Sequence, residues 1–170
     1  TVRVCREGWL HTGDVGELDE DGFLYVTDRV DNIFKTSGGE FVVPQRVEGL
    51  FKQSFLIDQM MIIGQDRKMV TALISPDFEN LKEWCADHDV PWQEDRKALL
   101  RQEAVQNRFE RLVEDRNQQL DAVERIKRYT LVADTWTVAG DELTPTMKIK
   151  RHKIKKEYRE TIEKMYEEDG

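Results

Sequence analysis

Apolar runs separated by short polar turns dominate the first half of the chain. The apolar run at 23–26 follows an Asp-Gly pair, a typical signal for a hairpin. A second hairpin is predicted where Lys-Thr-Ser-Gly-Gly at 35–39 separates the apolar runs 30–34 and 41–43. The apolar runs at 59–64 and 69–74, joined by a polar turn, predict an antiparallel pair of strands.

The spacing of apolar residues changes to a helical period at several later points. The expected helices are a short one from Pro44, one starting at Pro76–Asp77, a long one over 92–115 and a short piece near 120–124. A final apolar run at 129–133 predicts a strand that joins the earlier pair. The pattern therefore predicts an α+β fold: a three-stranded antiparallel sheet covered by helices, plus the hairpin with the Gly-Gly turn.

Composition limits the broad class of protein. The chain has 170 residues, which suits one domain or one domain with an appendage, and its abrupt start without methionine indicates a fragment. Cys5 and Cys85 are far apart, which favours free thiols in a reducing compartment. No apolar run approaches 18 residues, so we expect a soluble cytoplasmic protein, with peripheral membrane contact left open. The net charge of −8 argues against nucleic acid as a general partner.

Basic residues nevertheless gather late in the chain, where the segment 147–159 holds seven lysines and arginines and one acid, Glu157. Gly140 and Pro145 predict a turn just before Lys148, which places this lysine on a loop tip leading into a helix. Three interpretations stay open from the residues alone. The segment is a solvated helix face, a surface for nucleic acid or anionic lipid, or a loop that presents lysine to a phosphate-bearing substrate.

The two adjacent glycines, Gly38 and Gly39, allow positive φ and the close approach of another backbone or a narrow ligand. Taken alone they also suit a plain hairpin turn. No cluster of residues has the spacing of metal ligands, so no metal site is predicted.

Several ordered motifs change this picture: Gly-Trp-Leu-His-Thr-Gly-Asp at 8–14, Gly-Phe-Leu-Tyr-Val at 22–26, Asp-Arg at 28–29, Pro-Gln-Arg-Val-Glu at 44–48 and Leu-Thr-Pro-Thr-Met-Lys-Ile-Lys-Arg at 143–151. Together they resemble the AMP-forming adenylate-forming enzymes, most closely the long-chain fatty acid CoA ligases. The resemblance runs from Gly8 to Tyr166. It implies that residues 1–30 end a large amino-terminal domain and that residues 31–170 form a mobile carboxy-terminal domain.

The resemblance also implies roles for single residues. Lys148 matches the catalytic lysine for adenylate formation, and Asp31 matches the hinge about which the small domain rotates. Asp14 and Arg29 would contact the ribose of ATP or AMP. Met147 stands where the wider family usually has a glycine. Members that resemble long-chain fatty acyl ligases carry a bulky apolar residue there, so the methionine favours that subgroup.

The implied reaction joins a fatty acid to CoA through an acyl-adenylate, with release of pyrophosphate and AMP. Lys35, Gly38, Gly39 and Glu40 would form the wall for CoA in the second half. ATP, CoA and the Mg²⁺ that accompanies ATP are the implied cofactors, and the missing amino-terminal domain is the implied partner. The chain alone is expected to be inactive, and a different carboxylic acid or a basic binding module remain alternatives.

Overall fold

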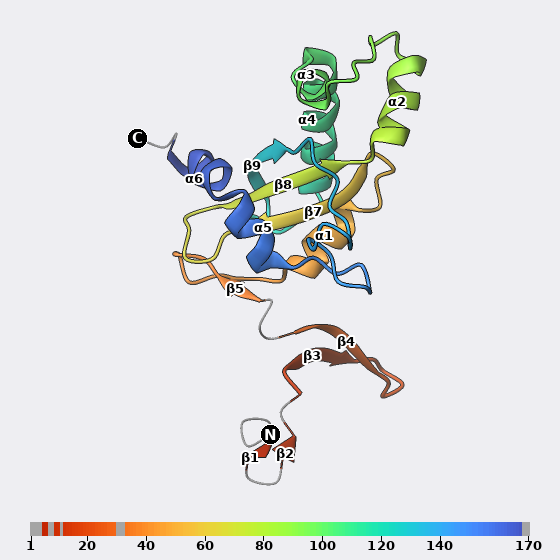
Figure 1. Cartoon of the computed structure of the whole chain (residues 1–170). Helices are drawn as coiled ribbons and strands as arrows, with labels where there is room; N and C mark the ends of the chain where they lie inside the picture. Colours follow the sequence, from red (N-terminus) through yellow and green to blue (C-terminus); the bar gives the residue numbers. More distant parts are fainter. Residues whose placement is uncertain (1–4, 7–8, 11, 30–32, 168–170) are drawn as a thin grey trace.

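The computed structural model describes residues 5–6, 9–10, 12–29 and 33–167 (Figure 1). Two small antiparallel hairpins come first. They pair β1 with β2 and β3 with β4, and the second carries a bulge between Val15 and Gly16. Their bounds are β1 Cys5–Arg6, β2 Trp9–Leu10, β3 Asp14–Leu18 and β4 Leu24–Arg29. Asp19 closes the β3–β4 turn by accepting from the backbone N–H of Phe23 at 2.8 Å, which confirms the predicted Asp-Gly hairpin.

The central sheet has the order β7-β8-β9, with β7 at Ile57–Ile63, β8 at Val70–Pro76 and β9 at Ile126–Leu131. β7 and β8 are antiparallel as predicted. The prediction that the third strand is also antiparallel was wrong, because β9 pairs parallel to β8. A parallel neighbour requires a long crossover, and the segment between β8 and β9 provides one with three helices.

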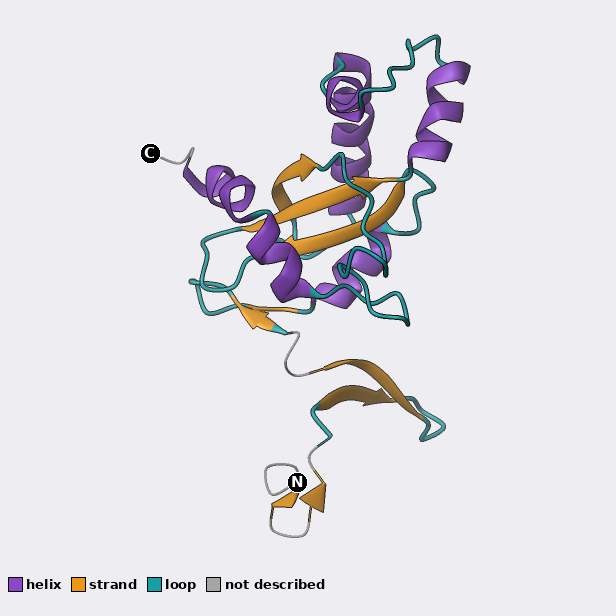
Figure 2. Ribbon diagram, in the orientation of Figure 1, coloured by secondary structure: helices purple, strands orange, loops and turns teal. Residues whose placement is uncertain are grey.

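The sheet is buried on both faces (Figure 2). Successive side chains of a strand point to opposite faces, so Met60 and Ile62 of β7 enter one core while Met61 and Ile63 enter the other. The first core also holds apolar residues of the four helices that lie within residues 44–117. The second holds Leu143 and residues of the two helices within residues 151–167. Both helical layers are therefore fixed to the same sheet.

Helix α1, Pro44–Phe51, has proline in its first turn, as the sequence predicts. Helix α2, Phe78–Asp87, is capped at its start by Asp77, whose carboxylate accepts from the Asn80 N–H at 2.9 Å. Cys85 is buried in the first core, which agrees with a packed thiol.

The predicted long helix over 92–115 is wrong, since the chain forms two helices, α3 at Arg96–Leu100 and α4 at Glu103–Asn117. Gln102 has extended backbone between them, and the Gln106 side chain donates to the carbonyl of Leu100. This local capping competes with continuation of the helix. The helical piece expected near 120–124 is also wrong, because that segment forms turns.

Helices α5, Arg151–Glu157, and α6, Arg159–Glu167, close the second core. The short hairpin of β5, Phe34–Lys35, and β6, Phe41–Val42, precedes α1. Within the described residues, the helices all lack the combination of length and apolar character that crossing a bilayer requires.

Candidate active site

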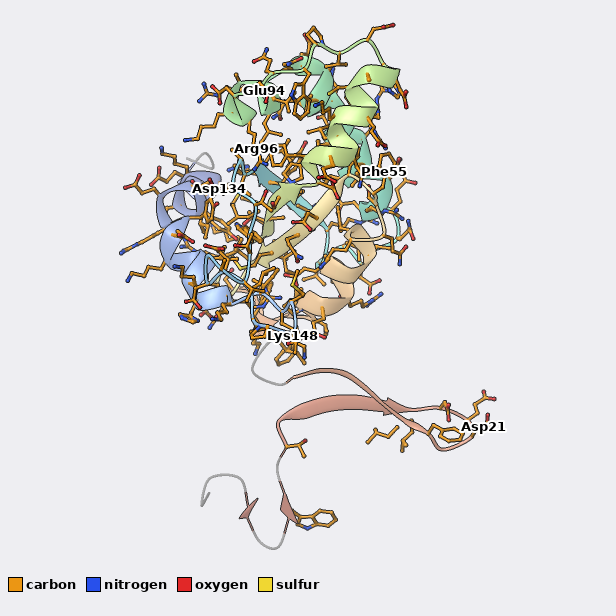
Figure 3. All side chains as sticks on the ribbon, turned by 45° about the vertical axis from the view of Figure 1, so that its right-hand side comes forward. Asp21, Phe55, Glu94, Arg96, Asp134 and Lys148 are labelled. Carbon is orange, nitrogen blue, oxygen red and sulfur yellow. The ribbon has the colours of Figure 1, made fainter. Side chains whose placement is uncertain are left out.

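Lys148 lies on a hydrogen-bonded loop that leads directly into α5 (Figure 3). Leu143 and Ile149 form an antiparallel bridge at the base of the loop. Above it, the Thr144 N–H donates to the Lys148 carbonyl at 2.8 Å, and the Lys148 N–H donates to Thr144 Oγ1 at 3.0 Å. Leu143 is 1% exposed and anchors the loop in the second core. The loop therefore holds the backbone of Lys148 in place while its side chain stays exposed.

The backbone of Met147 explains why glycine suits this position. Its φ is +61°, in the left-handed region that side chains other than glycine rarely adopt. Its N–H donates to the Thr144 carbonyl at 2.8 Å, which closes the tight turn before Lys148. The turn thus keeps the shape for which glycine is favoured, with methionine in its place.

A cavity of about 440 Å³ lies beside the loop, between it, α1 and the first half of β7. Lys148 and Lys52 are among its lining residues, and Lys52 donates to the side-chain oxygen of Gln59 at 2.9 Å. In the described part of the chain, no acceptor lies within hydrogen-bonding distance of the Lys148 ammonium. This leaves a cation available to an anionic group of a substrate.

Glu48 and Arg151 form a connection that sequence reasoning did not identify. Glu48 lies on α1 and is 7% exposed, yet one carboxylate oxygen accepts from Arg151 Nη2 at 2.6 Å. The other accepts from the backbone N–H of Ile62 in β7 at 2.9 Å. An acidic residue between Val47 and Phe51, on the apolar side of a predicted helix, was the available signal for it.

The basic segment 147–159 is partly neutralised by acids. Lys150 donates to Asp141, and Arg151 pairs with Glu48. The hydrogen bond and the charge of Lys150 lower the pKa of the Asp141 carboxyl. Burial, and then the charge of Arg151, lower the pKa of Lys155. Lys150 and Arg151 are therefore occupied by acids, which leaves less of the segment for a uniform basic surface.

The Gly-Gly hairpin is formed as predicted. The Thr36 N–H donates to the Glu40 carbonyl at 2.9 Å, and the Gly39 N–H donates to the Thr36 carbonyl at 3.0 Å. Gly39 has φ +90°, a conformation that residues with a side chain rarely adopt. Both glycines are exposed. The Lys35 ammonium lies 5.4 Å from the centre of the Phe41 ring, which holds it along the hairpin.

This hairpin is attached to the turn between β7 and β8. The Ser37 N–H donates to the Arg67 carbonyl, and the Asp66 N–H donates to the Lys35 carbonyl, both at 2.9 Å. The Lys148 loop instead faces Gln59 in the first half of β7. The structure thus holds Lys35, Gly38, Gly39 and Glu40 in one hairpin and holds Lys148 in a different loop.

Two further predicted residues lie in the β3–β4 hairpin. The strand register places Asp14 opposite Arg29, so the backbones of the two proposed ribose contacts are neighbours. Asp31, the predicted hinge, lies outside the described residues.

Comparison with protein families gives a match over residues 31–170 to the AMP-binding enzyme C-terminal domain. Long chain acyl-CoA synthetase 7, peroxisomal, of Arabidopsis thaliana is 35% identical over 165 residues, which are 95% of this chain and 23% of that protein. Fatty acyl-CoA synthetase B of Dictyostelium discoideum is 32% identical over 169 residues, which are 98% of this chain and 25% of that protein. The chain spans about a quarter of the length of these relatives.

Solved structures show the same fold. The adenylation domain of the carboxylate reductase from Mycobacterium chelonae matches with a TM-score of 0.72 and 28% identity, over 98% of this chain and 24% of that one. The corresponding domain from Segniliparus rugosus, in complex with AMP and a co-purified carboxylic acid, matches with a TM-score of 0.75 and 23% identity, over 100% of this chain and 25% of that one. With the family match covering most of its length, the chain belongs to the AMP-binding enzyme C-terminal domain family.

Proposed function

We propose that this chain is the carboxy-terminal part of an AMP-forming acyl-CoA ligase that acts on long-chain fatty acids. The observation that carries the proposal is Lys148, an exposed lysine without a pairing acid among the described residues, held on an ordered loop beside a cavity. The names of the relatives, which are long-chain and fatty acyl-CoA synthetases, support the substrate class.

In the first half of the reaction, a fatty acid carboxylate attacks the α-phosphate of ATP, forming acyl-adenylate and releasing pyrophosphate. Two anions must approach each other, and the Lys148 ammonium would lower their repulsion. A unit-charge contact at about 4 Å and an effective dielectric near 20 amounts to about 4 kcal/mol. Loss of Lys148 should therefore slow this half by about a hundredfold to a thousandfold.

In the second half, the thiol of CoA attacks the acyl carbon and AMP leaves. The hairpin of Lys35, Gly38, Gly39 and Glu40 would then form a wall along the thin pantetheine arm, because the glycines leave its backbone uncovered. The domain would rotate about Asp31 to exchange Lys148 for this hairpin. The presence of the two groups in separate, individually hydrogen-bonded segments supports such an exchange.

The cavity beside Lys148 fits anionic groups, since its lining includes two lysines. ATP would be shared with an amino-terminal domain, with Asp14 and Arg29 near its ribose. In the described ranges no cluster of three or more histidine, cysteine or acidic side chains could hold a metal ion. The proposal therefore assigns the Mg²⁺ of ATP to the amino-terminal domain.

The proposal also includes a cytoplasmic location, with membrane contact through the fatty acid substrate, which subcellular fractionation would test. A basic module for nucleic acid or anionic lipid is less favoured, because Lys150 and Arg151 already pair with acids. Binding to either that falls steeply with salt would support that alternative.

The test uses the whole enzyme that carries this chain, with ATP, CoA and a long-chain fatty acid. We expect thioester formation, and we expect Lys148→Ala to abolish most adenylate formation while sparing transfer from preformed acyl-adenylate. The 170-residue chain alone should form no thioester. Equal loss of both halves in the Lys148→Ala enzyme would remove Lys148 from the assigned role.

A further inference from the structure

A buried carboxylate connects three segments behind the Lys148 loop. Glu48 of α1 accepts from Arg151, the first residue of α5, and from the backbone N–H of Ile62 in β7. Residues 48 and 151 are 103 positions apart in the sequence. Arg151 follows Lys148 by only three residues, so this contact lies directly beside the end of the loop.

The β7 side of the connection is a rigid support. In the described sheet β7 is an edge strand, so its outward N–H groups have no neighbouring strand to pair with. One of them, the N–H of Ile62, donates to the Glu48 carboxylate, and this hydrogen bond holds the carboxylate in a single orientation. A fixed carboxylate then gives the Arg151 guanidinium a fixed place.

The loop side is equally ordered. The Lys150 N–H donates to the Glu142 carbonyl at 2.8 Å, and Leu143 pairs with Ile149. The loop is therefore a small hairpin whose closed end carries Lys148, and its base is joined to α1 through Arg151. Loss of the Arg151 side chain would remove this link between the hairpin and α1.

We propose that Glu48 and Arg151 are positioning residues for Lys148, holding its ammonium where the carboxylate and the α-phosphate meet. The inference rests on the proposed function of Lys148 in adenylate formation. Both residues also line the cavity beside Lys148, but the role proposed for them is to place the loop. Both act through the placement of the loop, where a displacement of about 1 Å can cost on the order of a hundredfold in rate.

The experiment measures both half-reactions in the whole enzyme for Arg151→Gln and Arg151→Lys. We expect Arg151→Gln to slow adenylate formation by about 10–100-fold and to leave transfer from preformed acyl-adenylate within about threefold of the unaltered enzyme. Arg151→Lys keeps the positive charge but loses the planar guanidinium with its several N–H donors. It should recover most of the rate of adenylate formation, and it should fold even where the glutamine variant does not. A double variant with Lys148→Ala should be no slower than Lys148→Ala alone.

A matched control is Arg46→Gln, which removes another ion pair of α1, 3.3 Å from Glu124, without touching the loop. We expect it to leave both halves unchanged. Hydrogen exchange in the Arg151→Gln enzyme should rise in residues 142–150 and remain unchanged in β7 and β8.

Three results would overturn the inference. If Lys148→Ala blocks adenylate formation while Arg151→Gln leaves it intact, positioning fails and the proposed function stands. If Arg151→Gln slows both half-reactions equally, or adds to the loss of rate in Lys148→Ala, Arg151 supports the stability of the whole domain and does not position Lys148. If Lys148→Ala itself leaves adenylate formation intact, the proposed role of Lys148 fails and the inference fails with it.

Discussion

Lys148 and Gly39 lie in two separately hydrogen-bonded segments of the domain. The loop of Lys148 faces Gln59, whereas the hairpin of Gly39 is hydrogen-bonded to the turn that follows Gly64. The domain therefore carries a cation and a glycine-lined turn in separate segments, and the proposed two-step reaction would use them in turn.

A side chain at Gly64 is predicted to disturb the packing of the β5–β6 hairpin. A side chain at Gly64 would place Cβ 2.7 Å from Cε2 of Phe34 and 3.3 Å from Cγ2 of Val70. Gly64→Ala should therefore destabilise the domain by about 1–3 kcal/mol, as overpacking does. Urea unfolding measures the change.

Gly49→Ala is the matched control for that substitution. Gly49 lies within α1, and a Cβ there meets nothing within 4 Å. Alanine in an exposed helix position should stabilise by about 0.5–1 kcal/mol. Equal effects of the two substitutions would show that the contact with Phe34 does not matter.

Met147 should tolerate glycine and reject a β-branched residue. Glycine relieves the positive φ of +61° but gives the unfolded chain more freedom, so Met147→Gly should change the unfolding free energy by less than about 0.5 kcal/mol. Met147→Val keeps the strain and adds branching at Cβ, and should cost about 1–2 kcal/mol. Thermal unfolding of the two variants checks this order, and a valine variant as stable as the glycine variant contradicts it.

Stability should fall in alkaline solution because of Tyr129. Burial, and then the charges of Glu110 and Glu114, raise the pKa of Tyr129 in the folded protein from its usual value of 10.0 to about 12. The unfolded state therefore releases its proton first, so this contribution is complete below pH 10 and is lost as the pH rises toward 12.

Tyr129→Phe removes the titrating group and should reduce the loss of stability between pH 9 and pH 11.5 by on the order of 1 kcal/mol, allowing for the solvent exposure of the ring. Urea unfolding at the two pH values measures it. An unchanged pH dependence in the phenylalanine variant would exclude Tyr129 as the cause.

Local patterns predicted much of the fold. The pair β7–β8, the proline at the start of α1 and the Asp77 cap of α2 all follow from residues close in sequence. The direction of β9 did not follow, because it depends on the path of the helical crossover rather than on the strand's own residues. The break between α3 and α4 did not follow either; there the Gln106 side chain donates to the carbonyl of Leu100, a contact that the apolar pattern does not reveal.

The candidate site was predictable to the same extent. The loop around Lys148 and the Gly-Gly hairpin are continuous segments, so their motifs could be found in the sequence. The pair of Glu48 and Arg151 joins positions 103 residues apart, and each alone looks like an ordinary charged residue of a helix. Only the folded arrangement shows that Glu48 is buried between β7 and α5.

The most direct test of the account compares Lys148→Ala with Gly39→Val in the two half-reactions of the whole enzyme. Gly39 has φ +90°, so valine distorts the hairpin whatever space surrounds it. We predict reciprocal defects: the lysine variant loses adenylate formation by at least about a hundredfold, and the valine variant loses thioester transfer by at least about tenfold. Each should keep the other half within a few-fold. Loss of the same half-reaction in both variants would contradict a domain that exchanges one segment for the other.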